Sequence, residues 1–176
     1  MYDRFNRRIN YLRISVTDLC NMRCVYCMPA EGVQLLDHDR ILTFEEIRDL
    51  VQVGVSMGID KVRLTGGEPL VRRGIITLVE MINSISGIAD FAMTTNAVFL
   101  PEYADALKEA GITRLNISLD TLDPVRFAAI SRGGDLGEVL AGIAAAQRTG
   151  FRKIKPNCVI DTSPEGMASI SATQLE

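Results

Sequence analysis

The chain has 176 residues, of which 47% are hydrophobic and 23% charged, and its net charge is -3. These values are typical of a folded globular domain, and they exclude a disordered chain and a small scaffold that depends on disulfides. With 19 basic and 22 acidic residues, the chain has no excess of positive charge for nonspecific nucleic-acid binding. The sequence shows no secretory signal and no apolar run long enough for a membrane span, so we expect a cytoplasmic protein with reduced thiols.

Strand-like apolar runs alternate with helical ones along the chain, which predicts an α/β fold. The predicted strands span residues 10–17, 61–65, 90–96, 114–120 and 152–160, and the predicted helices span 43–57, 71–84, 101–110 and 136–149. Thr43 before two glutamates indicates a helix start, and Gly58, Gly111 and Gly150 indicate helix ends. We therefore expect about five βα units in one core, residues 1–160, followed by a polar tail, residues 161–176.

Hydrophobic and polar residues alternate within the predicted strands, as in Leu12 and Ile14 against Arg13 and Ser15. Successive side chains of a strand point to opposite faces, so each strand has one apolar and one polar face. The strands of a sheet covered on both faces are instead nearly continuous apolar runs. The pattern predicts a partial, open parallel βα barrel with a polar interior and a site near the strand C-terminal ends. A flat sheet with one solvated face is the alternative.

Three of the four cysteines, Cys20, Cys24 and Cys27, lie within eight positions after the first predicted strand. This spacing lets three thiolates converge on one metal centre. A structural zinc site normally has four protein ligands, and only His38 or Cys158 could complete one. A 4Fe-4S cluster held by three cysteines leaves one iron open to another ligand. We expect His38 to be exposed, and Cys158, on the apolar face of the fifth strand, to be a buried thiol.

The cysteine triplet, with Tyr26 before its last cysteine, resembles the signature of the radical S-adenosylmethionine (SAM) enzymes. The stretch Gly66-Gly67-Glu68-Pro69 resembles the glycine-rich SAM motif of the same superfamily, and it falls at the C-terminal end of a predicted strand. The resemblance implies a partial parallel α/β barrel, one 4Fe-4S cluster on the three cysteines and SAM on the open iron. A zinc site or an incidental cysteine cluster is the alternative.

A closer resemblance covers about residues 8–160 and is to the GTP 3',8-cyclases, radical SAM lyases of molybdenum cofactor biosynthesis. The matching stretches are residues 11–18, 62–73, 94–96 and 115–123. The resemblance implies that a radical generated from SAM removes hydrogen from C3' of GTP, whose carbon then adds to C8 of guanine to give 3',8-cyclo-7,8-dihydro-GTP. It also implies an electron donor such as a flavodoxin or ferredoxin, a downstream enzyme that makes cyclic pyranopterin monophosphate, and a homodimer.

The family's functional positions carry over to matching residues of this chain. The cluster ligands match Cys20, Cys24 and Cys27; the SAM-binding positions match Tyr26, Gly67, Glu68 and Ser118; the GTP-binding positions match Arg13, Arg63, Thr94 and Lys155. No side chain is assigned as a catalytic acid or base. The GTP positions all lie on polar strand faces, where three basic side chains in one cavity would suit a triphosphate. Arg72 and Arg73, after the glycine motif, either approach an anion or lie on the surface at a helix start.

The sequence departs from the family in three places. Ala97 stands where the family usually has glycine, and Pro156 interrupts the fifth strand, which is tolerated at an edge or bulge. Family members also continue into a C-terminal region whose three cysteines bind a second cluster, and this sequence lacks that region. Three hypotheses follow: a truncated cyclase, a noncatalytic remnant that binds a cluster or nucleotide, and a radical SAM enzyme with another substrate.

Overall fold

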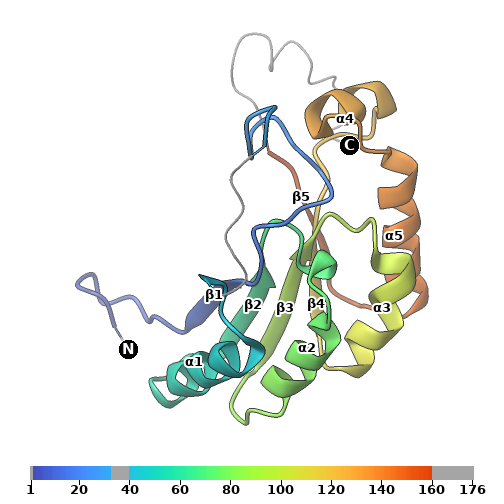
Figure 1. Ribbon diagram of the computed structural model, residues 1–176. Coiled ribbons are helices and arrows are strands. Elements are labelled where there is room, and N and C mark those ends of the chain that lie inside the picture. Colours follow the sequence, from blue (N-terminus) through green and yellow to red (C-terminus); the bar gives the residue numbers. More distant parts are fainter. Residues whose placement is uncertain (1, 33–39, 160–176) are drawn as a thin grey trace.

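The fold is one five-stranded sheet with helices between its strands, seen in a computed structural model that describes residues 2–32 and 40–159 (Figure 1). The strands are β1 (Tyr11–Ser15), β2 (Lys61–Thr65), β3 (Asp90–Thr95), β4 (Arg114–Ser118) and β5 (Ile154–Asn157). The helices are α1 (Phe44–Ser56), α2 (Ile75–Asn83), α3 (Leu100–Glu109), α4 (Pro124–Ser131) and α5 (Leu136–Arg148), with a short 3-10 turn, η2 (Pro69–Val71). None of the described helices is long and apolar enough to cross a membrane.

Every pair of neighbouring strands is parallel, and the strands stand in chain order from β1 to β5. Crossover connections between parallel strands are right-handed, so a sheet in chain order carries its crossover helices on one face. Figure 1 shows α1, α2, α3 and α5 following one another along the same side of the sheet. The open α/β sheet with five strands is confirmed, and its other face has no helix over it among the described residues.

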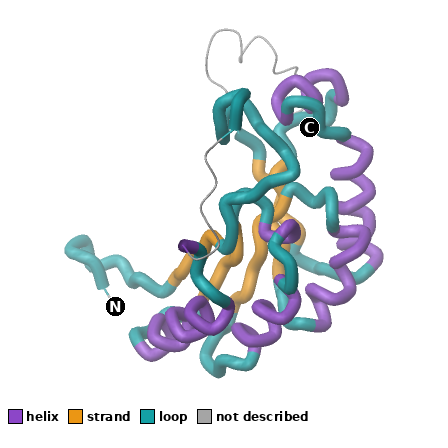
Figure 2. Tube along the Cα trace, viewed as in Figure 1, coloured by secondary structure: helices purple, strands orange, loops and turns teal. Residues whose placement is uncertain are grey.

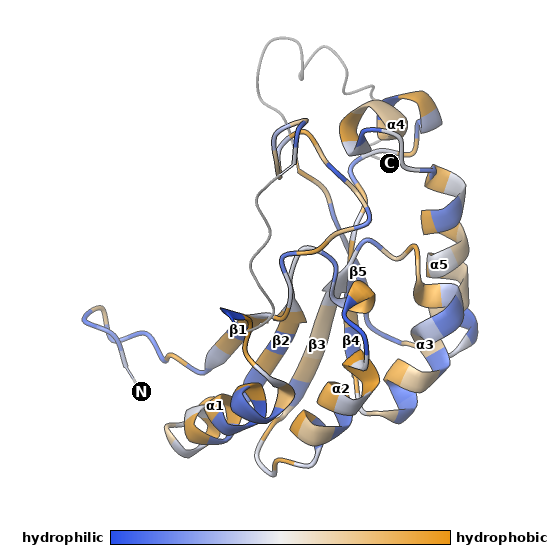
Figure 3. Ribbon diagram, in the orientation of Figure 1, coloured by the Kyte–Doolittle hydropathy of each residue, from blue (hydrophilic) through white to orange (hydrophobic). Residues whose placement is uncertain are grey.

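The hydrophobic core lies between the sheet and these helices. Leu64, Met93 and Ile117 of the strands are fully buried there, as are Ile47 of α1 and Leu78 of α2. Burial of each such side chain stabilises the fold by roughly 1.5–3 kcal/mol. Hydrophobic and hydrophilic segments alternate along α1 and α5 in Figure 3, as expected of helices with one buried side. The apolar strand faces thus fix the helices and leave the polar faces open.

The element boundaries differ from the sequence predictions where regular pairing stops before the alternation does. Strand β1 ends at Ser15, β4 at Ser118 and β5 at Asn157, each before the predicted end. The helix predicted from residue 71 begins at Ile75, because residues 69–71 form η2 and Gly74 adopts a left-handed φ of 78°. The predicted tail, residues 161–176, and His38 lie outside the described residues.

Helix α4 was not predicted, although its start carries a recognisable signal. The Asp123 side chain accepts a hydrogen bond from the Arg126 backbone N–H, and Pro124 occupies the first turn. An aspartate cap followed by proline is a common helix start. Pro156 lies in β5, which pairs with β4 and forms an edge of the described sheet, as its proline predicts.

The turn after β3 packs against α5 at a contact that only glycine allows. Ala97 is fully buried with a left-handed φ of 71°, a conformation that costs a non-glycine residue about 1–2 kcal/mol. A Cβ atom built on Gly142 of α5 would overlap the Ala97 carbonyl oxygen and lie 3.1 Å from the Ala97 Cβ. This close approach sets how α5 sits beside the end of β3.

The substitution Gly142→Ala should lower the free energy of unfolding by about 1–3 kcal/mol, because the added methyl group overpacks a backbone contact. Urea denaturation of the two proteins would measure the difference. The matched control is Gly54→Ala in α1, where a Cβ would make only ordinary contacts of 3.5 Å or more. The free energy of unfolding of this variant should stay the same or rise. Equal stabilities of the Gly142→Ala variant and the unchanged chain would contradict this account of the contact.

Candidate functional site

The glycine motif after β2 lies against the segment that leads to Cys20. Backbone pairing of β1 and β2 continues past both strands, since Gly67 N–H donates to Thr17 O at 2.8 Å and Glu68 N–H donates to Leu19 O at 2.8 Å. A Cβ on Gly66 would lie 2.7 Å from Thr17 O, and one on Gly67 would overlap the Leu19 carbonyl. The two glycines therefore permit the approach that brings the two sequence motifs together.

Glu68 is a buried carboxylate, 1% exposed, at the junction of β2, β3 and the cysteine loop (residues 18–28). It accepts hydrogen bonds from Leu70 N–H at 3.1 Å, Thr95 Oγ1 at 2.8 Å and Asn96 N–H at 2.7 Å. Burial raises the pKa of Glu68, and the three hydrogen bonds offset part of that rise. Its position therefore links the ends of two strands to the cysteine loop.

The three cysteines of the loop are free thiols that influence one another electrostatically. Cys20 and Cys24 are partly buried and Cys27 is exposed. Burial is the main cause that raises the pKa of each thiol, and the charge of Cys27 raises the pKa of Cys20 and Cys24 further. Three thiols whose negative charges disfavour one another suit a bound cation, and sulfur ligands suit iron-sulfur clusters and zinc. Within the described ranges, no three His, Cys, Asp or Glu side chains are already arranged to hold a metal ion.

The C-terminal end of α4 holds the cysteine loop from the side. Arg23 N–H donates to Ser131 O at 3.3 Å, and Val25 N–H donates to Ile130 O at 2.9 Å. Arg132, with a left-handed φ of 56°, donates from Nη1 to the Arg23 and Met28 carbonyl oxygens at 3.0 and 2.7 Å. Sequence reasoning missed these supports because it missed α4, whose Asp-Pro start was the available signal.

Tyr26 connects the cysteine loop to the end of β4. Its hydroxyl donates to Asp120 Oδ2 at 2.6 Å, and burial together with this carboxylate raises the pKa of Tyr26. Asp120 Oδ1 also accepts from Val159 N–H at 2.8 Å, and the Asp120 carbonyl lies 3.2 Å from Cys158 Sγ. The prediction that Cys158 is buried is wrong: the thiol is exposed, because β5 ends at Asn157 and the strand alternation no longer applies.

The residues matched to GTP positions lie on the open face of the sheet, in two adjacent rows. Arg13 pairs in register with Arg63, while Thr94 and Lys155 flank Asn116 in the next row toward the carboxyl ends. Arg13 and Lys155 are exposed, whereas Arg63 and Thr94 are partly buried. Ser118 follows one row farther, opposite Asn157. In Figure 2, loop segments gather at the end of the sheet where the cysteine loop lies.

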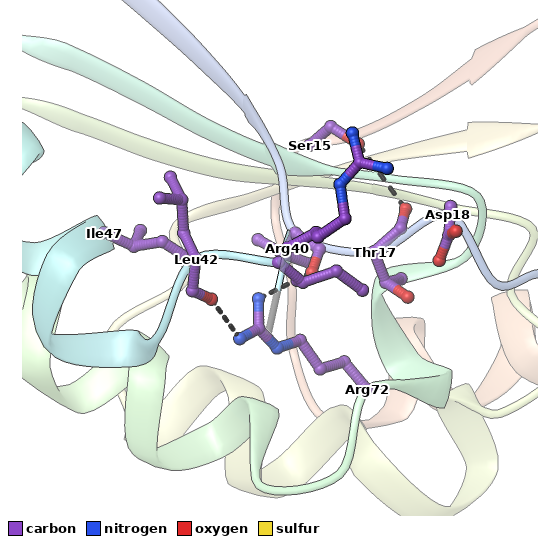
Figure 4. A pocket seen from close by; sticks show the side chains of 9 residues that line it. Ser15, Thr17, Asp18, Arg40, Leu42, Ile47 and Arg72 are labelled. Atoms are coloured by element: carbon purple, nitrogen blue, oxygen red, sulfur yellow. Dashed lines mark hydrogen bonds between the residues drawn. The ribbon is translucent and has the colours of Figure 1, made fainter. Parts of the chain in front are cut away.

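Arg72 is a structural link between the end of β1 and the start of α1. Figure 4 shows its guanidinium reaching into a pocket of about 210 Å³, where it donates to Val16 O and Leu42 O, both at 2.6 Å. The guanidinium carbon also lies 4.5 Å from the centroid of the Phe44 ring. Arg72 is partly buried and its donors are used within the chain, so it is not the exposed residue expected at a helix start. Arg73 is exposed.

Residues 14–162 match the family model of the Radical SAM superfamily. The GTP 3',8-cyclase of Alkaliphilus oremlandii is 58% identical over 159 residues, which are 90% of this chain and 50% of that protein. The GTP 3',8-cyclase of Petrotoga mobilis is 47% identical over 176 residues, 100% of this chain and 53% of that protein. The chain thus spans about half the length of the curated relatives it matches.

Solved structures with a similar fold include HydG, a maturase of the [FeFe]-hydrogenase, with a TM-score of 0.70 and 20% identity over 85% of this chain and 35% of that chain. Another is Streptococcus suis SuiB bound to S-adenosylmethionine, with a TM-score of 0.69 and 18% identity over 90% of this chain and 34% of that chain. At these identities the likeness shows the fold alone.

The buried carboxylate predicts a pH dependence of stability that Glu68→Gln should remove. Below the ordinary glutamate pKa of 4.5, the carboxyl is protonated in both the folded and the unfolded chain. Above it, the unfolded chain loses the proton first, since the folded pKa is raised, and the free energy of unfolding must fall with rising pH until Glu68 ionises in the fold. Urea denaturation from pH 4 upward should show this fall in the unchanged chain relative to the Gln variant. Parallel pH profiles would refute the burial effect.

Proposed function

The chain belongs to the radical SAM superfamily, and from that membership we propose that it carries the SAM-cleaving core of a GTP 3',8-cyclase. The observation that carries the proposal is the contact of the glycine motif with the cysteine loop, through the Gly67–Thr17 and Glu68–Leu19 backbone hydrogen bonds. Relatives named GTP 3',8-cyclase, with identities of 47–58%, support the choice of reaction. Three basic residues of the open face, Arg13, Arg63 and Lys155, support the choice of a phosphorylated substrate.

In this proposal Cys20, Cys24 and Cys27 hold one 4Fe-4S cluster. The donor set fits, since three free thiols share one loop and the charge of Cys27 raises the pKa of both Cys20 and Cys24. When bound together, the cluster and SAM would supply a carbon radical through one-electron reductive cleavage of SAM. The chain's own contribution is to fix the loop, through the glycine motif on one side and α4 on the other.

SAM would be held at the carboxyl ends of β2 and β4, by Tyr26, Gly67, Glu68 and Ser118. The Glu68 carboxylate accepts two hydrogen bonds at Oε1 and one at Oε2, so Oε2 retains acceptor capacity for the amine of SAM. Gly67 is exposed, and its N–H already donates a hydrogen bond to Thr17 O. A ligand would therefore contact the Cα and the carbonyl of Gly67. Tyr26, fixed by Asp120, would border the same space.

GTP would lie on the open face, where Arg13, Arg63 and Lys155 bring three positive charges to two adjacent rows and Thr94 adds a hydroxyl. Fixed cations form charge-assisted hydrogen bonds to phosphate, and arginine does so with two parallel donors. These side chains would orient the nucleotide so that its ribose faces the carboxyl ends of the strands. A different phosphorylated substrate of the same superfamily is the competing assignment.

We also propose partners and a location for this protein. One-electron reduction calls for a donor such as a flavodoxin or ferredoxin, and the product calls for the enzyme that makes cyclic pyranopterin monophosphate. The thiols require a reducing compartment, and we place the protein in the cytoplasm. We also propose a homodimer, and a core of residues 1–160.

The direct test is anaerobic cluster reconstitution followed by measurement of 5'-deoxyadenosine formed from SAM under a strong reductant, with and without GTP. Formation of deoxyadenosine that rises with GTP would support both the chemistry and the substrate. A bound cluster with no cleavage would indicate a chain that binds the cluster without turnover. Cleavage of SAM at the same rate with and without GTP would point to another substrate.

The substitution Cys24→Ala should abolish most of the visible absorbance of the reconstituted cluster, because it removes one of three protein ligands. Iron and sulfide content per chain would be measured on the same samples. Cys158→Ala is the matched control: it also removes a thiol, but one that is exposed beyond β5, and it should leave the cluster content unchanged. Full cluster content in the Cys24→Ala protein would refute the ligand assignment.

The double substitution Arg63→Ala with Lys155→Ala should weaken GTP binding by at least roughly tenfold, since a single charge-assisted hydrogen bond contributes about 1.5–3 kcal/mol. Equilibrium dialysis with GTP and with guanosine would measure it, and guanosine binding should change little. Arg148→Ala on the exposed side of α5 serves as the control for lost positive charge. Unchanged GTP affinity in the double variant would remove the open face as the nucleotide site.

A further inference from the structure

Asn116 is a buried polar side chain on the otherwise open face of the sheet. It is 1% exposed and stands in β4 between Thr94 of β3 and Lys155 of β5. A buried amide is costly unless its polar atoms have partners. Asn116 thus lies between two residues of the proposed GTP site and needs a partner of its own.

The partner of Asn116 is the guanidinium of Arg63. With the amide turned so that its oxygen faces the guanidinium, that oxygen lies 3.1 Å from Nε, 2.9 Å from Nη2 and 3.0 Å from Nη1 of Arg63. A guanidinium is planar, and a point nearly equidistant from its three nitrogens lies on the normal through its central carbon. The Asn116 oxygen therefore contacts the face of the guanidinium and not its edge.

The path of the Arg63 side chain explains how it reaches Asn116. Arg63 belongs to β2 and Asn116 to β4, so the side chain must cross β3, and neighbouring strands are about 4.8 Å apart. The residue of β3 paired with Arg63 is Ala92, whose methyl group leaves room for the crossing. The guanidinium carbon also lies 5.2 Å from the centroid of the Tyr11 ring, a cation-π distance.

This arrangement leaves the edge of the guanidinium available for a ligand. The N–H groups lie in the plane of the group, and it is these donors that match the oxygens of a phosphate. A contact through the face holds the group in place without using the paired donors along its edge. An arginine held in this way loses less side-chain entropy when a ligand binds, which favours affinity.

We propose that Asn116 is a positioning residue that presents Arg63, edge outward, to a polyphosphate on the open face. The inference rests on the proposed function, since it concerns the same site, but it adds a residue that acts through Arg63 and does not touch the ligand. Arg13, which pairs with Arg63 in register and is exposed, provides the internal comparison.

The first arm of the test uses no nucleotide. In the 176-residue chain, 15N NMR of the arginine side chains should show slow rotation about the Nε–Cζ bond of Arg63, assigned by its loss in Arg63→Lys. The nearly isosteric Asn116→Leu should speed this rotation, because the Asn116 oxygen no longer contacts the face of the Arg63 guanidinium. Asn116→Ala, which adds no apolar bulk, is run in parallel so that the result does not depend on the folding of one variant. Equal rotation in the unchanged chain and both variants would overturn the proposal.

The second arm measures the affinity for GTP and for inorganic tripolyphosphate. Asn116→Leu should lower both affinities by roughly three- to tenfold, the cost of ordering one long side chain on binding. In the Arg63→Ala background the same substitution should not lower the two affinities further. In the Arg13→Ala background it should lower them by the same three- to tenfold as in the unchanged chain. Asn116→Asp should weaken binding more, because its carboxylate would occupy the guanidinium edge and repel phosphate.

The outcomes separate this inference from the proposed function. If Asn116→Leu lowers the affinity for GTP and tripolyphosphate equally with and without the Arg63 side chain, Asn116 does not act through Arg63. That result would overturn the positioning role alone. Loss of GTP binding in Arg63→Ala but none in Asn116→Leu would also overturn it while leaving the substrate assignment intact. Binding of neither GTP nor tripolyphosphate by the unchanged chain would overturn both the positioning role and the GTP site, but the deoxyadenosine assay would still test the SAM chemistry.

Discussion

The close backbone approach between Gly66-Gly67 and residues 17–19 is the constraint on which the candidate site depends. It extends the parallel pairing of β1 and β2 beyond the regular strands through two 2.8 Å hydrogen bonds. A side chain at either glycine would collide with backbone atoms, which cannot move aside as a flexible side chain can. The contact therefore fixes where the cysteine loop leaves the sheet, and it places Cys20 near the buried Glu68.

Other elements of the fold then hold the loop from the remaining directions. The end of α4 accepts two backbone hydrogen bonds from it, Arg132 bridges two of its carbonyls, and Asp120 binds Tyr26. These contacts join residues about 100 positions apart in the sequence. They use backbone atoms for the most part, so the loop is positioned while its thiols remain available as ligands.

The one-sided cover of the sheet explains why a polar face exists at all. Strands in chain order with right-handed crossovers place the helices on one face, and the other face keeps its arginines, lysine and hydroxyls. Alternation in the sequence reveals this face, because side chains repeat every two residues in a strand. The same alternation failed at Cys158, where the strand had ended and the thiol is exposed.

The sequence by itself determined the α/β order, the two motifs and the set of polar strand positions, because these depend on local periodicity and on short spacings. It did not reveal α4, Arg132, Asp120 or the contact between Asn116 and Arg63 as parts of the site. Those depend on which strands become neighbours and on how closely backbones approach, as where Ala92 lets an arginine cross β3. Only the tertiary structure decides such contacts, since they join residues whose distance in the chain carries no signal of proximity.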